Sequence, residues 1–346
     1  MVLVTGGTGL VGSHLIFDLL KKGYKVKALV RNSSNRTQIL QTFAFYCSEP
    51  KVLFDKIIWV EGDITDILSL EDAFIDIEQV YHAAAFVSFN HSDRAKIYKN
   101  NVDGTSNIVN LCLEKKINKL CFVSSIAAIG VTDDGTPIKE DILWKPAKNQ
   151  SSYSKSKYKA EMEVWRGITE GLNAVIVNPS VILGPGHKKN GNHSIFKLIA
   201  NGLPFYTLGI TGFVDVRDVT KAMIELMESN ISSERFILST ENITYKSFFE
   251  MVANVLRVKP PHRYFSPWIS SIAWRLEYIR ALLFQVPPKL TKNTVDISYK
   301  KLIYSSEKVK KTINIDFRPI EKTLTELGQF YAKQLKSIPL SSRSHV

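Results

Sequence analysis

Cysteine is scarce in this chain of 346 residues, which contains only Cys47, Cys112 and Cys121. Their spacing matches no metal-binding motif, and Cys112 and Cys121 fall within apolar helix and strand patterns. Few cysteines without a pairing pattern are typical of proteins in a reducing compartment. We therefore expect a cytoplasmic protein with neither a disulfide framework nor a bound metal.

Long hydrophobic runs are also lacking. The charge-poor stretch 198–214 is interrupted by four turn-forming residues, Gly202, Pro204, Gly209 and Gly212. Since a transmembrane helix needs about 20 consecutive apolar residues, no membrane span is predicted. The first strand-like residue is Val2, which leaves no room for the charged and apolar regions of a signal peptide.

Acidic residues are outnumbered, 33 against 45 lysines and arginines, and the formal charge is +12. The basic residues are spread along the chain, and the denser groups have no interleaved aromatic residues of the kind that bind RNA. These denser groups contain Lys300, Lys301, Lys308, Lys310 and Lys311. We expect solvated surface there and no nucleic-acid partner, while an anionic cofactor or substrate would benefit from the charge.

Hydrophobic residues make up 45% of the chain, enough for one large domain or two closely joined ones. Strand-like runs alternate with helix-like patterns as far as Leu238. The expected strands are Val2–Val4, Lys25–Val30, Lys56–Val60, Gln79–Tyr81, Leu120–Val123, Ala174–Asn178, Phe213–Val216 and Arg235–Leu238. This alternation predicts an α/β fold with a doubly wound parallel sheet. Beyond Thr240 only helical patterns follow, and they predict a smaller, mostly helical C-terminal lobe.

The stretch VLVTGGTGLVGSHL, residues 2–15, carries the clearest motif. Gly6, Gly9 and Gly12 recur every third residue between a short apolar run and a helix-like pattern from Leu10 to Leu20. A glycine turn between a strand and a helix places free backbone N–H groups and the positive end of the helix dipole at one point. The motif predicts dinucleotide binding, although glycine turns that bind nothing also join strands to helices.

The end of the second strand bears on the choice of cofactor. An acidic side chain there would bind the ribose 2′-hydroxyl of NAD, but the strand ends at Arg31, Asn32 and Ser33. A guanidinium offers a planar fork of donors to a 2′-phosphate, so Arg31 favours NADP(H) over NAD(H) unless it is only a surface residue.

The next strand ends offer further cofactor contacts. Asp63, after the third strand, suits the adenine amino group, but it could equally cap a helix that follows Thr65. After the fourth strand, His82 is followed by Ala83, Ala84 and Ala85, whose small side chains would let a cofactor approach the backbone or allow close packing alone. A helix is predicted over Asn101–Asn110.

Polar residues that suit catalysis follow the fifth strand. Ser124 and Ser125 stand at its carboxyl end, where ligands of parallel sheets bind. In the helical pattern after them, with Ser151 or Ser152 as N-cap, Tyr153 and Lys157 lie four residues apart and share one helix face. Such a pair is weak evidence alone, since Tyr304 and Lys308 form another. Asn178–Gly186, rich in proline and glycine, is predicted to be a loop.

Taken together these motifs resemble the extended branch of the short-chain dehydrogenase/reductase superfamily. They are TGGTGLVG from Thr5, GDI from Gly62, HAAA from His82, NVDGT from Asn101, the serines at 124 and 125, YSKSK from Tyr153, and NPSVILGPG from Asn178. NPSVILGPG followed by FVDVRDV from Phe213 resembles the dihydroflavonol reductase, cinnamoyl-CoA reductase and hydroxysteroid dehydrogenase group. Sugar-modifying relatives usually carry an arginine in place of Asn178, and sugar dehydratases an acidic pair in place of Ile126 and Ala127.

The resemblance implies a Rossmann fold and assigns roles to residues. Tyr153 would be the general acid/base, Lys157 its partner and a ligand of the nicotinamide ribose, and Ser125 the group that orients the substrate oxygen. Ser125 is preferred to Ser124 because the family's serine precedes a short run that ends in glycine, here Gly130. The remaining implied cofactor contacts are Gly6, Thr8, Gly9, Leu10, Val11, Arg31, Asp63, Ile64, Ala83, Ala84, Ala85, Asn101, Pro179 and Val181.

The expected function is NADP(H)-dependent reduction of an aldehyde or ketone, or the reverse oxidation of an alcohol, a small-molecule substrate in either direction. The alternatives are an NAD-dependent nucleotide-sugar epimerase or reductase and a non-catalytic NADP(H)-binding protein. Relatives often form homodimers through the tyrosine-bearing helix. Aromatic residues beyond residue 260 would suit an apolar substrate or a packed core equally: Tyr264, Phe265, Trp268, Trp274, Tyr278 and Phe284.

The expected division of the chain has three parts. Residues 1–178 and 212–240 would form the NADP(H)-binding Rossmann domain, and residues 179–211 and 241–340 the substrate-binding lobe. Residues 341–346 would form a disordered tail.

Overall fold

A seven-stranded parallel sheet forms the centre of the computed structural model, which describes residues 1–346 except 89, 133, 147–149, 187–190, 285–289 and 337–346. The strand order is β10-β6-β5-β4-β1-β2-β3. The bounds are β1 Val2–Thr5, β2 Val26–Val30, β3 Ile58–Glu61, β4 Gln79–His82, β5 Lys119–Val123, β6 Ala174–Pro179 and β10 Glu234–Leu238. Every neighbouring pair is parallel. The doubly wound Rossmann sheet predicted from the sequence is therefore confirmed.

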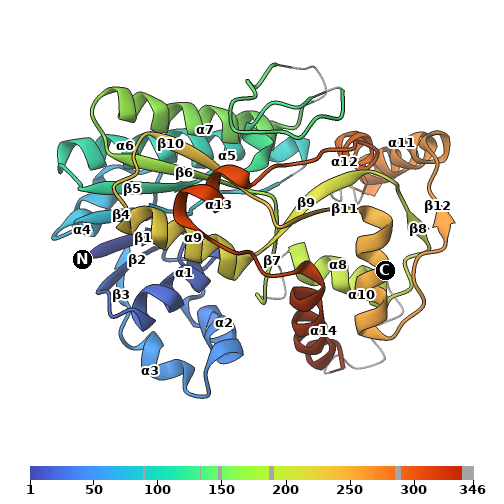
Figure 1. Cartoon of the computed structure of the whole chain (residues 1–346), viewed down its shortest axis with the longest axis horizontal. Helices are drawn as coiled ribbons and strands as arrows, with labels where there is room; N and C mark the ends of the chain where they lie inside the picture. Colours follow the sequence, from blue (N-terminus) through green and yellow to red (C-terminus); the bar gives the residue numbers. More distant parts are fainter. Residues whose placement is uncertain (89, 133, 147–149, 187–190, 285–289, 337–346) are drawn as a thin grey trace.

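Helices cover both faces of this sheet (Figure 1). On one face lie α1 (Leu10–Lys21) and α9 (Val216–Glu228), and on the other α6 (Gly104–Glu114) and α7 (Ser152–Thr169). Each face has its own apolar core, so the central strands are buried on both sides and read as continuous apolar runs. The strand order reverses between β1 and β4, which opens a crevice at their carboxyl ends, the usual ligand site of such sheets.

Shorter helices fill the connections of the first half. They are α2 Ile39–Tyr46, α3 Pro50–Phe54, α4 Glu71–Phe74 and α5 Arg94–Tyr98, with single turns at 36–38, 68–70, 91–93 and 126–128. A five-residue π-helix, Lys99–Asp103, precedes α6. The predicted helix over 101–110 therefore exists, but its first turn is widened.

The C-terminal part holds a three-stranded sheet, β11-β9-β7, in which β11 is antiparallel to β9. Its strands are β7 Val181–Leu183, β9 Ile210–Asp215 and β11 Glu241–Thr244, and a separate pair joins β8 Phe205–Tyr206 to β12 Arg263–Tyr264. The helices are α8 Gly191–Ala200, α10 Tyr245–Leu256, α11 Pro267–Phe284, α12 Lys292–Ser298, α13 Glu307–Ile313 and α14 Ile320–Lys336. Phe196, Phe213, Phe248, Leu324 and Tyr331 lie at its core.

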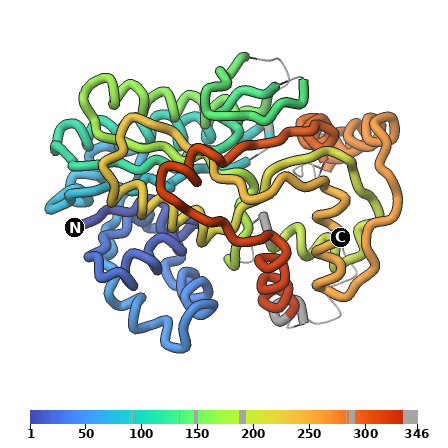
Figure 2. The backbone as a smooth tube through the Cα atoms, viewed as in Figure 1, coloured from blue at the N-terminus to red at the C-terminus, as the bar shows by residue number. Residues whose placement is uncertain are grey.

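The chain passes repeatedly between the two parts. Figure 2 shows the segment after α13, which lies beside β10, crossing to α14 beside α10 and α8. The division into two domains stays a prediction, and the tail expected at 341–346 lies outside the described residues. Within the described part of the chain, no helix has the length and apolar character that a bilayer crossing requires.

All eight predicted strands are present, but four short ones, β7, β8, β11 and β12, were not expected. β7 lies inside the predicted loop Asn178–Gly186, between Pro179 and Gly184, because it pairs with β9 some thirty residues later. β11 and β12 lie where only helices were predicted, and each is held by a partner strand distant in the sequence. Local propensity does not reveal strands this short, because pairing with distant residues stabilises them.

Candidate active site

The turn between β1 and α1 admits only glycine at two of its three predicted glycines. Gly6 has a φ of +71°, and a Cβ there would lie 2.6 Å from the amide nitrogen of Ala84. A Cβ on Gly12 would lie 2.2 Å from the carbonyl oxygen of Gly6. The turn closes through a hydrogen bond of 2.9 Å from the Gly9 N–H to the Gly6 carbonyl. The backbone of β1, α1 and the residues after β4 therefore meet at van der Waals distance.

The N-terminus of α1 is arranged to receive an anion. Its N-cap is Gly9, no side chain caps it, and its first turn contains no acidic residue. The first N–H groups of the helix and the positive end of its dipole thus face the crevice without a counter-charge from the helix itself. Together with the close glycine turn, this geometry fits a dinucleotide diphosphate.

A cavity of about 260 Å³ adjoins this turn. Nine of the predicted cofactor residues line it: Gly6, Thr8, Gly9, Arg31, Asp63, Ile64, Ala83, Ala84 and Ala85. Sequence reasoning missed six others, Leu29, Val30, Ser34, Gly62, Phe86 and Asn100. The structure therefore brings the ends of β1, β2, β3 and β4 around one space.

Two charged residues of this cavity differ in how far they are already engaged. Arg31 is exposed at the end of β2, and its carbonyl accepts a hydrogen bond from the Ser34 N–H. Asp63 Oδ1 accepts hydrogen bonds of 2.9 Å from the N–H and the hydroxyl of Thr65. Asp63 thus stabilises a turn rather than a helix N-terminus, since α4 begins only at Glu71.

Asn101 is occupied in the structure by other protein groups. Its Nδ2 donates to the Phe86 carbonyl and to the Ser156 hydroxyl, and its Oδ1 accepts from the Phe86 N–H at 2.7 Å. It therefore joins the segment after β4 to α7, while the adjacent Asn100 lines the cavity.

Four other predicted cofactor residues do not line this cavity: Leu10, Val11, Pro179 and Val181. The segment after β7 nevertheless reaches α1. His14 of α1 hydrogen-bonds through Nε2 to the Pro185 carbonyl at 2.8 Å, and a Cβ on Gly184 would lie 3.3 Å from Leu10. Burial lowers the pKa of His14 to about 4, so this contact is made by a neutral imidazole.

Ser125 and Tyr153 meet at the carboxyl end of β5. Ser151 caps α7 by accepting from the Ser154 N–H at 3.0 Å, which places Tyr153 in the first turn of the helix. Burial raises the pKa of Tyr153, and a hydrogen bond with the Ser125 side chain opposes that rise. Ser124, in contrast, points to the protein interior and donates to Glu161 at 2.5 Å. Of the two serines, Ser125 is the one in contact with the tyrosine.

Lys157 lies one turn further along α7 and is buried. Its ammonium donates to the Val123 carbonyl at 2.7 Å and lies 4.8 Å from the centre of the Phe122 ring. Burial lowers its pKa to about 8, against the opposing effect of the Glu161 charge. α7 thus places a cation at the end of β5, one helical turn after Tyr153.

A buried histidine beside this site was not singled out from the sequence. His82 Nδ1 lies 2.7 Å from the Thr5 hydroxyl, and Nε2 lies 3.1 Å from the Thr105 hydroxyl. Burial, reinforced by the charge of Lys157, lowers its pKa to about 3. The neutral ring therefore ties β1, β4 and α6 together, and only its place at a strand end could have drawn attention to it.

Glu161 was missed as well, although it continues the spacing of Tyr153 and Lys157 by four residues. It is fully buried and accepts from Ser124, from Asn178 Nδ2 at 2.8 Å and from Arg235 at 2.9 Å. Asn178 also donates to the Ser125 carbonyl at 3.0 Å. This carboxylate therefore fixes the backbone that presents Ser125.

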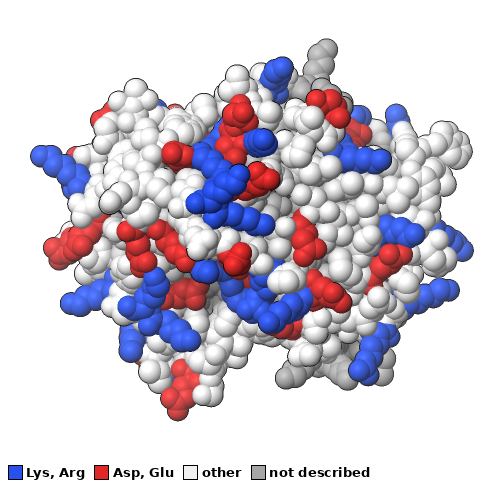
Figure 3. Space-filling model, in the orientation of Figure 1, with Lys and Arg blue, Asp and Glu red and all other residues white. Residues whose placement is uncertain are grey.

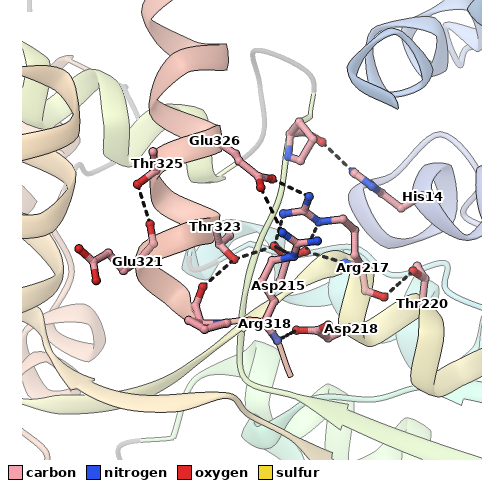
Figure 4. A network of polar contacts seen from close by, with 12 residues as sticks. His14, Asp215, Arg217, Asp218, Thr220, Arg318, Glu321, Thr323, Thr325 and Glu326 are labelled. Atoms are coloured by element: carbon pink, nitrogen blue, oxygen red, sulfur yellow. Dashed lines mark hydrogen bonds and ion pairs between the residues drawn. The ribbon is translucent and has the colours of Figure 1, made fainter. Parts of the chain in front are cut away.

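The FVDVRDV motif, at the end of β9 and the start of α9, is joined to the C-terminal helix α14 by polar contacts (Figure 4). Arg217 donates to both oxygens of Asp215, at 2.8 and 2.5 Å, and to Glu326 of α14 at 2.6 Å. Burial disfavours the charge of Asp215, but the bonds from Arg217 outweigh that effect and lower its pKa. Thr323 of α14 donates to the same carboxylate at 2.7 Å. The motif thus caps α9 and anchors α14.

Comparison with known proteins agrees with this geometry. A profile of the NAD-dependent epimerase/dehydratase family matches residues 2–238. The chain belongs to this family. Its expected place in the extended short-chain dehydrogenase/reductase superfamily is confirmed, as is its nature as an NAD(P)-dependent oxidoreductase.

Several members of the family are similar over much of their length. A protein of Synechocystis sp. that carries the name “Putative dihydroflavonol 4-reductase” is 30% identical over 95% of this chain and 93% of its own. Cinnamoyl-CoA reductase 1 of Petunia hybrida is 28% identical over 71% of this chain and 74% of its own. A crystal structure titled gox2253 superposes with a TM-score of 0.80 at 30% identity, covering 96% of this chain and 98% of that one.

Proposed function

We propose that this enzyme reduces an aldehyde or ketone with NADP(H), or oxidises the corresponding alcohol, with Tyr153 as general acid/base. The observation that carries the proposal is the contact between the Tyr153 and Ser125 side chains, with the Lys157 ammonium one helical turn away. All three lie where β5 ends, beside the cavity at the ends of β1 and β4. The similar proteins named as reductases support it.

The residues account for the proton in this reaction. When a bound nicotinamide supplies hydride to the carbonyl carbon, the oxygen gains electrons and needs a proton. Tyr153 can donate that proton from its hydroxyl, while Ser125 holds the same oxygen by a hydrogen bond. The positive charge of Lys157 favours the phenolate that remains. In the reverse direction the phenolate takes the proton from the alcohol.

The preference for NADP(H) rests on Arg31. It is the charged residue that lines the cavity at the end of β2, and the second half of the cavity, around Asp63, lies at the neighbouring strand end. Its exposed guanidinium is free to turn toward a 2′-phosphate at the rim, where a bidentate contact is geometrically suited.

Titration of NADPH and NADH binding to the purified protein tests the cofactor assignment. We expect tighter binding of NADPH, and we expect Arg31→Ala to weaken it about 10- to 100-fold, the effect of losing a charge-assisted contact, while leaving NADH unchanged. Arg36→Ala is the matched control, because Arg36 is a neighbouring arginine that lies near Glu61 and Trp59 instead. If both variants lost NADPH affinity equally, or if the wild type bound NADH more tightly than NADPH, the assignment of Arg31 to the 2′-phosphate would be wrong.

Asn178 argues against the nucleotide-sugar alternative. Sugar-modifying relatives usually carry an arginine there, whereas both donated bonds of this buried amide go to Ser125 and Glu161. NAD retained through purification, together with ordered binding of a nucleoside diphosphate sugar, would favour the epimerase. If Tyr153→Phe left both cofactor binding and the rate of NADPH oxidation unchanged, the protein would be a cofactor-binding protein without catalytic activity.

A further inference from the structure

Helix α11, Pro267–Phe284, has its polarity reversed relative to a surface helix of a soluble protein. Ser270 is fully buried and Glu277 is largely buried, yet the large apolar residues face outward. Trp268 is 73% exposed, Leu276 62% and Leu283 72%. A surface helix normally directs such residues at the core and its polar ones at water. Of the aromatic residues noted from the sequence beyond residue 260, four are exposed and do not lie in the apolar core: Tyr264, Trp268, Tyr278 and Phe284.

The outward residues form one continuous stripe. Trp268, Ile269, Ile272, Leu276, Ile279 and Leu283 are all exposed. At about 100° per residue these six positions fall within an arc of about 100°, along nearly the whole length of the helix. Contiguous apolar surface of this kind marks an interaction site, whereas scattered exposed apolar residues do not. Figure 1 shows α11 at the rim of the molecule beside α12.

The segment of the chain that contains the stripe is basic. Residues 257–301 contain nine lysines and arginines against two acidic residues, a net of +7 out of the +12 of the whole chain. Both acids already have cationic partners, Glu277 with Arg280 and Asp296 with Lys292. Arg275 is exposed at the edge of the stripe, where its guanidinium lies 4.7 Å from the Trp274 ring. On the face that Figure 3 shows, basic and acidic side chains are interspersed.

We propose that α11 is a membrane-surface helix that lies in the plane of a bilayer containing anionic lipids. Its apolar stripe would enter the boundary between headgroups and acyl chains, with Trp268 and Tyr278 at the interface, and the surrounding cations would contact lipid phosphates. Charge decides between this occupant and a second copy of the chain, because two copies apposed on this face would bring two strongly basic segments together. A flat lipid surface also matches a single convex helix, since a protein partner of this stripe would need a complementary groove.

Vesicle flotation tests the proposal. We expect the full-length protein to float with phosphatidylcholine vesicles that contain phosphatidylglycerol, less with phosphatidylcholine alone, and less again at high salt. Leu276→Asp combined with Leu283→Asp should weaken binding at least about tenfold, since both charges would enter the apolar boundary. Arg275→Gln should weaken binding to the anionic vesicles alone, by a smaller factor.

The control is the pair Leu68→Asp and Leu143→Asp, two leucines equally exposed elsewhere in the molecule. This variant should float like the wild type. Unchanged thermal unfolding and NADPH binding in all variants would show that each is folded, independently of any reaction. The proposal is wrong if the wild type fails to float, or if the α11 variant floats equally well. The proposal is also wrong if the wild type sediments as a dimer and the only effect of the α11 variant is to make it sediment as a monomer, because the stripe would then be an interface between two copies of the chain.

Discussion

Glu161 and Arg235 form a buried ion pair, with Oε1 and Nη1 2.9 Å apart. They join α7, the helix that carries Tyr153 and Lys157, to β10 at the edge of the sheet. Arg235 also donates to the Glu140 carbonyl at 2.8 Å, so the pair connects α7 to the loop outside that edge.

Removing the cation of this pair should be strongly destabilising. In Arg235→Met the carboxylate of Glu161 would stay buried without its ion-pair partner, and we expect a loss of about 3–5 kcal/mol in the free energy of unfolding, measured in urea. Adding Glu161→Gln should recover part of the loss because it removes the stranded charge. Lys308→Met, which breaks the partly exposed pair with Glu234, should cost less than about 1 kcal/mol. A wild-type urea midpoint for Arg235→Met would contradict this interpretation.

Stability should fall in acid because His14 is buried in its neutral form. Its pKa is about 4 in the folded protein and 6.5 as an ordinary value, so between these limits the unfolded chain binds a proton that the folded chain does not. Stability is therefore full above pH 6.5 and declines toward pH 4, by about 3 kcal/mol from this residue alone. His82 acts in the same direction and extends the decline to lower pH.

His14→Gln, which keeps a donor for the Pro185 carbonyl, should flatten the dependence of stability on pH. His262→Gln is the control, because it makes the same substitution at an exposed surface position. Urea unfolding at a series of pH values measures both slopes. If the two variants showed the same slope, His14 would not be the group that takes up the proton.

Ser125→Ala should shift the pH dependence of alcohol oxidation upward. The hydrogen bond from Ser125 opposes the rise that burial causes in the pKa of Tyr153, so its loss raises that pKa further. Oxidation requires the phenolate, and the rising limb of kcat/KM against pH should therefore move to higher pH, with a rate reduced about 100-fold. Ser124→Ala should lower stability through Glu161 without moving the limb. A shift in Ser124→Ala but not in Ser125→Ala would reverse the roles of the two serines.

Gly12→Ala should abolish tight cofactor binding. The added Cβ would meet the Gly6 carbonyl oxygen at 2.2 Å and push apart the turn that receives the diphosphate. We expect NADPH to bind at least about tenfold more weakly. Gly23→Asn tests the opposite end of the same helix, where φ is +88° and nothing lies within 4 Å of a Cβ, and asparagine tolerates this conformation. Equal effects at both positions would show general destabilisation of α1 rather than damage to the turn.

The sequence predicted those features that depend on contiguous residues. The glycine turn, the strand ends and the spacing of Tyr153 and Lys157 are local patterns, and the structure places them around one crevice. Glu161 was not predicted as part of the site, because it lies in a polar helix and its main partner, Arg235, is 74 residues away in the sequence. β7 and β11 were not predicted for the same reason, because they are stabilised by pairing with β9, which is distant in the sequence.

The outward face of α11 shows a different limit. Apolar and aromatic residues in a helical pattern normally predict a buried face, and nothing in the pattern says which side the helix turns to the protein. Only the folded chain shows that Ser270 and Glu277 lie on the buried side of the helix.

The most direct test of the central claim is turnover with and without Tyr153. The wild type and Tyr153→Phe would be mixed with NADPH and a panel of aldehydes and ketones, and the loss of NADPH absorbance followed, after binding of NADPH to both has been measured. We expect equal NADPH binding in both proteins and a rate that falls by at least about 100-fold in Tyr153→Phe. A Tyr153→Phe variant that oxidises NADPH at the wild-type rate would contradict it.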